Sequence, residues 1–306
     1  MSQYQRLFLI VGPTMRHTPA LERAVALAKA TDALLHIAVF IEDVDILGLM
    51  SGNEHFREIC QQENQKWLQD EAQLIRGNGI TVTTEVVLAR DVLQEILQHV
   101  KDLQPDLVIK DVHHESTLKR VFATPLDWHL LRDCPVAVHL VSEVRCPLPR
   151  VIVAAVDLSH PDHPITDLND RIIQAAQRMT NQCEAELHLL HAFDPSQTHI
   201  SDAGAGAVTM PGFSTDVRRS LQHAFTTLAD NYQVPSERQH FLEGSPTKVM
   251  SDFAAHSRAD VIIMGDTHRK GLHRLMGSTT EHVLYKVPCN VLAIKGHVDQ
   301  QGSSAA

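Results

Sequence analysis

The sequence lacks the features that mark several specialised classes of protein. Its five cysteines are odd in number and form no C-x-x-C pair, so neither a disulfide framework nor a zinc ribbon is expected. It has no apolar run near the roughly 18 residues that a membrane-spanning helix needs. It also lacks an excess of positive charge, because its 37 acidic and 27 basic residues give a net charge of −10. Binding to nucleic-acid phosphates is therefore disfavoured.

Motifs of common enzyme classes are missing as well. The sequence contains no G-x-x-x-x-G-K-[ST], no H-E-x-x-H and no G-x-S-x-G. The apolar run Leu7–Val11 near the start is too short for a signal peptide, and no small-residue cleavage site follows it. We therefore expect a cytoplasmic protein that contacts neither membrane nor nucleic acid, and a binding protein rather than an enzyme.

What the sequence does have is an internal repeat. At 306 residues the chain is long enough for two domains, and five apolar landmarks of the first half recur in order in the second, about 150 residues later. They are Leu7–Val11 with Ile152–Val156, Leu35–Ile37 with Leu187–Leu189, Val86–Leu88 with His240–Leu242, Asp106–Ile109 with Asp260–Ile263, and Cys134–Val136 with Cys289–Val291.

The pattern within each half predicts an α/β fold. Runs rich in β-branched residues alternate with helical patterns, which is typical of βαβ units around a parallel sheet. Thr18 followed by Pro19 predicts the start of the first helix. A second helix is predicted from Glu54 to Arg76, where Gly77 ends it. Each half is thus expected to be a doubly wound domain with a five-stranded parallel sheet.

Domain boundaries follow from the linker between the repeats. Residues 142–149 contain Pro147 and Pro149, which interrupt regular structure. We expect one domain over residues 1–144, a second over 150–296, and a disordered polar tail over 297–306. Two like halves predict an intramolecular pseudo-dimer, and a homodimer is also open.

Segments of both halves together resemble a known family. These segments are Val153–Ser159, Val261–His268, Gly277–Leu284, Val287–Ile294 and, in the first half, Thr124–Leu131. In this order they resemble the universal stress protein family in its tandem, two-domain form, over about residues 1–296. The resemblance implies the adenine nucleotide alpha hydrolase-like fold, which is a five-stranded parallel sheet with helices on both faces.

The second half carries a candidate ligand site. Open parallel sheets bind ligands beyond the carboxyl ends of their strands, where the strand order reverses. Asp157, His191-Ala192 and Met264-Gly265 follow or end three predicted strands there. Beyond them, Gly277 precedes a predicted helix that starts near Ser278, and a helix N-terminus suits phosphate. These residues favour a phosphate-bearing ligand.

The resemblance implies that this ligand is ATP, ADP or a related nucleotide. In the family, the loop has the pattern G-x-x-G-x9-G-[ST]. Carried over by position, the binding residues are Ala155, Asp157, Ala192, Met264, Gly265, His268, Gly277, Ser278, Thr279 and Thr280. The sequence departs from the pattern twice. His268 replaces the second glycine, and eight residues instead of nine separate His268 from Gly277. A weak ATPase or nucleotide hydrolase, and an interaction module that binds no nucleotide, are the alternatives.

The first half is poorer in such residues. Gly12 stands in the place of Asp157, and Lys110-Asp111 in that of Met264-Gly265. Phe122-Ala123 replaces Gly277-Ser278, and a loop without glycine is a poor phosphate cradle. We expect a structural role for this half. The alternative is an apolar ligand lined by Phe122 and Trp128.

Twenty histidines make metal binding a question for this chain. Three groups hold candidate ligands, and none has a spacing typical of zinc sites. They are Asp111, His113 and His114; His160, Asp162 and His163; and Asp266 with His268. No residue is assigned to a metal, and metal binding stays open. Cys134 and Cys289, which are equivalent in the repeat, are interpreted as buried apolar side chains.

Overall fold

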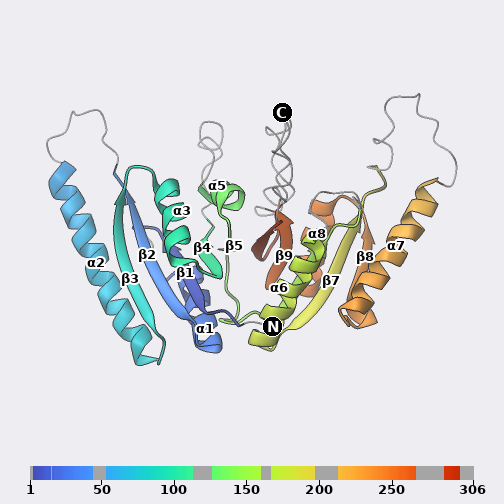
Figure 1. Cartoon of the computed structure of the whole chain (residues 1–306), viewed down its shortest axis with the longest axis horizontal. Helices are drawn as coiled ribbons and strands as arrows, with labels where there is room; N and C mark the ends of the chain where they lie inside the picture. The colour runs from blue at the N-terminus through green and yellow to red at the C-terminus, as the bar shows by residue number, and fades with distance from the viewer. Residues whose placement is uncertain are drawn as a thin grey trace, which may run out of the picture. The chain divides into compact units, whose positions relative to one another are not determined.

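A computed structural model describes residues 3–14, 16–43, 53–112, 126–159, 167–196, 213–266 and 286–296 of the chain. The chain divides into two compact units, Met1–Leu148 (unit 1) and Pro149–Ala306 (unit 2). In both units strands alternate with helices (Figure 1). The predicted α/β fold is therefore confirmed, whereas the expected tail at 297–306 lies outside the described residues.

Unit 1 contains a parallel sheet in the order β3-β2-β1-β4-β5. Its elements are β1 Arg6–Val11, α1 Pro19–Thr31, β2 Leu34–Glu42, α2 Asn53–Gly77, β3 Val82–Ala89, α3 Val92–Leu103, β4 Leu107–Asp111, α5 Leu126–Asp133 and β5 Ala137–Val141. The chain leaves β1 toward β2 and later returns to β4 on its other side. The strand order therefore reverses between β1 and β4.

Unit 2 repeats this order as β10-β9-β6-β7-β8, again with parallel pairs. Its elements are β6 Val151–Val156, α6 Leu168–Cys183, β7 Glu186–Phe193, α7 Phe213–Asn231, the short helix η2 Ser236–Arg238, β8 Gln239–Glu243, α8 Pro246–Ser257, β9 Val261–Asp266 and β10 Asn290–Lys295. The order reverses between β6 and β9, which is where a ligand site is expected.

Helices cover both faces of each sheet. Successive residues of a strand face opposite sides, and on β4 Lys110 contacts Asp127 of α5 while Asp111 contacts Ala20 of α1. On β7, His188 lies against Phe253 of α8 and His191 against Phe225 of α7. The central strands are consequently buried on both sides, as their continuous apolar runs predicted.

Local signals in the sequence account for the helix ends. Thr18 is the N-cap of α1, and its Oγ1 accepts a hydrogen bond from the Leu21 N–H at 3.2 Å. Pro19 is the first helical residue, as predicted. Helix α2 ends at Gly77, one residue beyond the expected end. It runs alongside β3 at the edge of its sheet (Figure 1).

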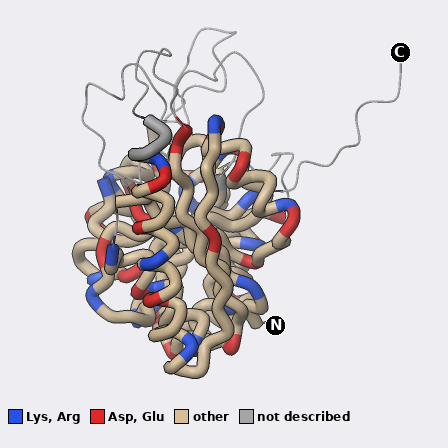
Figure 2. Tube along the Cα trace, turned by 90° about the vertical axis from the view of Figure 1, so that its left-hand side faces the viewer, with Lys and Arg blue, Asp and Glu red and all other residues tan. Residues whose placement is uncertain are grey.

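The described helices and charges agree with the composition. Within the part of the chain that the structure describes, no helix is both long and apolar enough to cross a membrane. Basic and acidic residues are interspersed along the chain in the view of Figure 2. This pattern fits a chain whose charges of both signs total −10.

Candidate functional site

The strands of unit 2 bring together the candidate residues that lie in the described ranges. Ala155 of β6 pairs with Met264 of β9 on one side and with Leu190 of β7 on the other. Val156 pairs with His191, so the next residues along the two strands are Asp157 and Ala192. Ala155, Asp157, Ala192, Met264 and Gly265 thus share the carboxyl edge at which the strand order reverses.

Asp157 is exposed and held in a fixed turn. Its Oδ1 accepts a hydrogen bond from the Ser159 N–H at 2.9 Å. The side-chain amide of Asn169, in the first turn of α6, binds the backbone of Asp157 at two atoms. Its Oδ1 accepts from the Asp157 N–H at 3.0 Å, and its Nδ2 donates to the Asp157 carbonyl at 2.7 Å. Sequence reasoning missed Asn169, because only the fold brings it to Asp157.

Gly265 has a packing role that the sequence did not reveal. A Cβ atom at this position would lie 2.5 Å from Cδ2 and 2.9 Å from Cγ of Leu168. Leu168 is the first residue of α6, so the helix begins directly over the end of β9. The glycine lets α6 approach the sheet, whereas its resemblance to the family loop had pointed only to ligand contact.

His191 lies at this edge as the strand pattern predicted, although it was not among the predicted binding residues. It is 1 % exposed, and its Nδ1 lies 3.0 Å from the Val156 carbonyl. Because a carbonyl only accepts, Nδ1 carries the proton. The Nε2 atom is buried with no hydrogen-bond partner among the described residues. Burial lowers the pKa of His191, and the Val156 hydrogen bond and the Asp157 charge oppose this only in part.

The equivalent edge of unit 1 is occupied by charged side chains that bind one another. Lys110 Nζ lies 2.7 Å from Asp127 Oδ1, and these side chains are only 5 % and 1 % exposed. Lys110 Nζ also donates to the Asp111 carbonyl at 2.9 Å. Asp111 Oδ1 accepts from the Ala20 N–H at 2.9 Å. Where unit 2 has Met264-Gly265, unit 1 therefore has Lys110 in a buried ion pair and Asp111 in a hydrogen bond to the first turn of α1.

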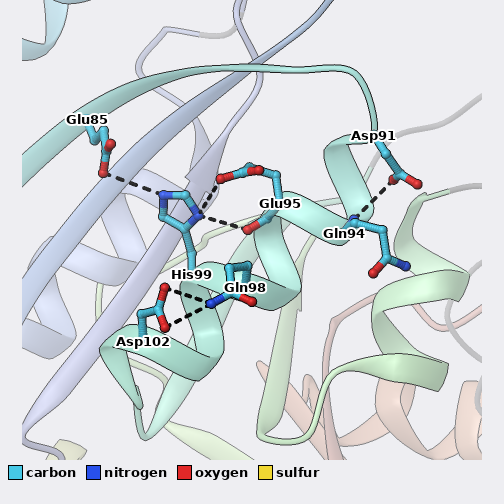
Figure 3. A network of polar contacts seen from close by, with 7 residues as sticks. All are labelled: Glu85, Asp91, Gln94, Glu95, Gln98, His99 and Asp102. Atoms are coloured by element: carbon cyan, nitrogen blue, oxygen red, sulfur yellow. Dashed lines mark hydrogen bonds and ion pairs between the residues drawn. The ribbon is translucent and has the colours of Figure 1, made fainter.

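Histidines also lie between the edge strand and the helix that follows it in each unit, on helix α3 in unit 1 and on strands β7 and β8 in unit 2. In unit 1, Nε2 of His99 lies 3.5 Å from Glu85 Oε2, and its Nδ1 lies 2.8 Å from the Glu95 carbonyl (Figure 3). In unit 2, His188 Nδ1 lies 3.0 Å from His240 Nε2. Burial lowers the pKa of His188 and of His240.

The described residues contain no group of three or more side chains placed to hold a metal ion. Most members of the candidate metal groups lie outside the described residues, namely His113, His114, His160, Asp162, His163 and His268. The same holds for Gly277, Ser278, Thr279 and Thr280 of the candidate nucleotide site, and for Phe122 and Ala123. Cys134 and Cys289 are buried as predicted, at 1 % and 6 % exposure.

Comparisons with known proteins place both halves in one family. The sequence model described as the universal stress protein family matches residues 3–142 and again 150–295. The chain is 29 % identical over 307 residues to universal stress protein E of Photorhabdus laumondii, with 96 % of each chain covered. It is 27 % identical to universal stress protein E of Escherichia coli K12, over 96 % of this chain and 95 % of that one.

Solved structures show the same two-domain fold. A protein of unknown function from Pseudomonas aeruginosa PAO1 is 26 % identical, with a TM-score of 0.73 over 96 % of this chain and 93 % of that one. A universal stress protein from Archaeoglobus fulgidus has a TM-score of 0.68 at 19 % identity, over 97 % and 98 % of the two chains. The tandem, two-domain form expected from the sequence is confirmed.

Proposed function

The chain belongs to the universal stress protein family, with one family domain in each half, and we propose that its second unit binds a small phosphate-bearing ligand. The ligand is ATP, ADP or a related nucleotide, held at the carboxyl ends of β6, β7 and β9. In this proposal the protein is a cytoplasmic stress-response protein that senses or carries the ligand and does not turn it over rapidly.

The observation that carries the proposal is the difference between the two strand edges. In unit 2, Asp157 is an exposed carboxylate in a fixed turn beside Met264-Gly265. In unit 1, Gly12 stands in the place of Asp157. Lys110, in the place of Met264, is buried against Asp127. A carboxylate that faces solvent can accept hydrogen bonds from the amino group of a base or from a ribose hydroxyl. A buried internal pair offers no such contact, so we assign the ligand to unit 2.

The phosphate end of the ligand is assigned from the sequence alone. Gly277-Ser278-Thr279-Thr280 combines a glycine with three hydroxyl side chains before a predicted helix. Arg269, Lys270 and Arg274 add positive charge to the preceding loop. His268, in place of the family's second glycine, favours the alternative of an interaction module that binds no nucleotide.

Titration calorimetry with ATP and ADP tests the proposal. Asp157→Ala should weaken binding by about 1.5–3 kcal/mol, the range for a hydrogen bond to a charged group. Gly277→Val should abolish binding, because a β-branched side chain blocks close approach of the phosphates. The matched control is Asp230→Ala, another exposed aspartate, near the C-terminal end of α7. This variant should bind the nucleotides as the unaltered protein does.

Three outcomes separate the alternatives. Equal losses from Asp157→Ala and Asp230→Ala would contradict the assigned position. Failure of the unaltered protein to bind either nucleotide would favour the interaction module. Steady phosphate release that Gly277→Val abolishes would identify a nucleotide hydrolase instead of a simple binding protein.

A further inference from the structure

Helices α1 and α6 occupy equivalent places in the two units, but the hydrogen bonds at their first turns differ. In α1, the N-cap Thr18 makes a side-chain capping bond, and Asp111 of β4 accepts from the N–H of the second helical residue, Ala20. In α6, the N-cap Asp167 makes no side-chain capping hydrogen bond. The second helical residue there is Asn169, and it reaches out to a strand end instead.

The first turn of α6 bridges the two strands between which the order reverses. Leu168 packs over Gly265 at the end of β9. Asn169 is the next residue, and its amide binds the backbone N–H and carbonyl of Asp157, directly after β6. One helical turn therefore contacts both Asp157 and the end of β9, which are neighbours in the sheet and form two sides of the proposed ligand site.

The contacts of Asn169 differ from ordinary stabilising contacts. They lie at an exposed site, and an exposed hydrogen bond adds little net free energy of folding because water replaces it when it is lost. Two bonds to the backbone of one residue, to the N–H of Asp157 at 3.0 Å and to its carbonyl at 2.7 Å, nevertheless restrict the orientation of that residue. The Ser159 N–H then donates to its carboxylate and restricts the side chain. The effect of the arrangement is orientation of a carboxylate before a ligand arrives.

We propose that Asn169 is a positioning residue that determines specificity for the nucleoside part of the ligand. The proposal rests on the proposed function of unit 2. Asn169 acts through Asp157, whose carboxylate accepts hydrogen bonds from the hydroxyl or amino groups of a nucleoside. Polyphosphate has no such donors to offer a carboxylate, so Asn169 affects the affinity for ATP and not the affinity for inorganic tripolyphosphate.

A double-mutant cycle on the full chain tests this role, with ATP and inorganic tripolyphosphate as probes in titration calorimetry. Asn169→Ala should weaken ATP binding roughly tenfold, the equivalent of one or two hydrogen bonds lost. Asp157→Ala should weaken it about 10- to 150-fold. The double variant should bind ATP no more weakly than Asp157→Ala alone, because Asn169 has no effect once the carboxylate is gone.

The matched control is Gln177→Ala, which removes another side-chain amide of α6. Its Nε2 donates to the Tyr232 carbonyl at 3.0 Å, two helical turns beyond Asn169. It should leave ATP affinity unchanged. Thermal unfolding of each variant identifies any general loss of structure.

The outcomes distinguish this proposal from the one on which it rests. If the unaltered protein binds neither probe, both proposals are wrong. If it binds ATP but the effects of Asn169→Ala and Asp157→Ala simply add, only the positioning role is wrong. An equal loss of ATP and tripolyphosphate affinity in Asn169→Ala would also overturn it, because a structural defect in the site would affect both probes.

Discussion

The two units share a strand order and differ at the point where that order reverses. In unit 1 the polar groups at this point bind one another, since Lys110 pairs with Asp127 and Asp111 holds the start of α1. In unit 2 the same positions are Met264 and Gly265, and the carboxylate of Asp157 is exposed. The comparison teaches that the fold supplies the location of a site, while a few side chains decide whether a ligand can use it.

A second difference lies under α3 and α8. The strand register places His240 of β8 where β3 has Glu85, because their partners Leu190 and Ala38 are equivalent in the repeat. This is one residue away from the pairing of His240 with Val86 that the sequence repeat predicted. Unit 1 therefore sets a carboxylate against its helix histidine, His99. Unit 2 sets two imidazoles against each other, at 3.0 Å between His188 and His240. The edge strand thus presents a carboxylate to a histidine of the helix in unit 1, and an imidazole to a histidine of the neighbouring strand in unit 2.

The largest effect is expected from breaking the buried pair of unit 1. Lys110→Met leaves the Asp127 carboxylate buried without its ammonium partner, which should cost about 3–5 kcal/mol of unfolding free energy. Urea denaturation followed by tryptophan fluorescence measures this in unit 1, because Trp67 and Trp128 both lie there. Adding Asp127→Leu should recover most of the loss. A double variant no more stable than Lys110→Met would contradict this account of the pair.

Filling the glycine of unit 2 should have the next largest effect. Gly265→Ala places a Cβ 2.5 Å from Leu168 Cδ2, and overpacking of this kind costs about 1–3 kcal/mol. Urea denaturation followed by circular dichroism gives the value. Combining the change with Leu168→Ala should make room for the new methyl group, so the combined loss should fall short of the sum. Strict additivity would show that the start of α6 is not packed against β9.

The helix starts offer a smaller comparison. Thr18→Ala removes the capping bond to the Leu21 N–H and should cost about 1 kcal/mol. Asp167→Ala should cost less, because Asp167 makes no side-chain capping hydrogen bond. Thermal unfolding of the two variants compares them directly. A greater loss from Asp167→Ala would reverse the expected order.

The smallest and most gradual effect should be a difference in acid stability. Burial lowers the pKa of His188, His191 and His240 in unit 2 below 6.5, and also that of His36 in unit 1. As the pH falls, these histidines therefore take up protons at a higher pH in the unfolded chain than in the folded one. The stabilisation is complete above pH 6.5 and is lost as the pH falls through the folded-state pKa values. Because the described part of unit 2 has more histidines with a lowered pKa than that of unit 1, unit 2 should lose stability first as the pH falls.

Hydrogen exchange followed by mass spectrometry at pH 7.5 and 5.5 measures this difference. After correction for the intrinsic effect of pH on exchange, the segments of β7 and β8 should lose more protection than those of β2 and β3. His240→Gln removes one titrating ring, and the loss of protection in β7 and β8 should then be closer to that in β2 and β3. Earlier loss of protection in β2 and β3 would contradict the expectation.

Much of the fold was predictable because it depends on local patterns. The apolar runs of the repeat and the Thr18-Pro19 helix start have direct counterparts in the structure. The candidate site was predictable only as a place. Ala155, Asp157 and Met264 lie at one edge because parallel strands of a doubly wound sheet must end together. Asn169 was missed, and the contacts of His191 were not predicted, because nothing adjacent in the sequence marks them.

The sequence by itself determined the repeat, the alternation of strands and helices, and the edge of the sheet at which the candidate site residues lie. These follow from periodicity and from short-range signals that each segment carries alone. Only the tertiary structure decided that Lys110 finds Asp127, that Gly265 makes room for Leu168, and that Asn169 holds Asp157. Each of those contacts joins residues 12 to 97 positions apart. A side chain's partner at such separations is set by packing and register, which no single segment specifies.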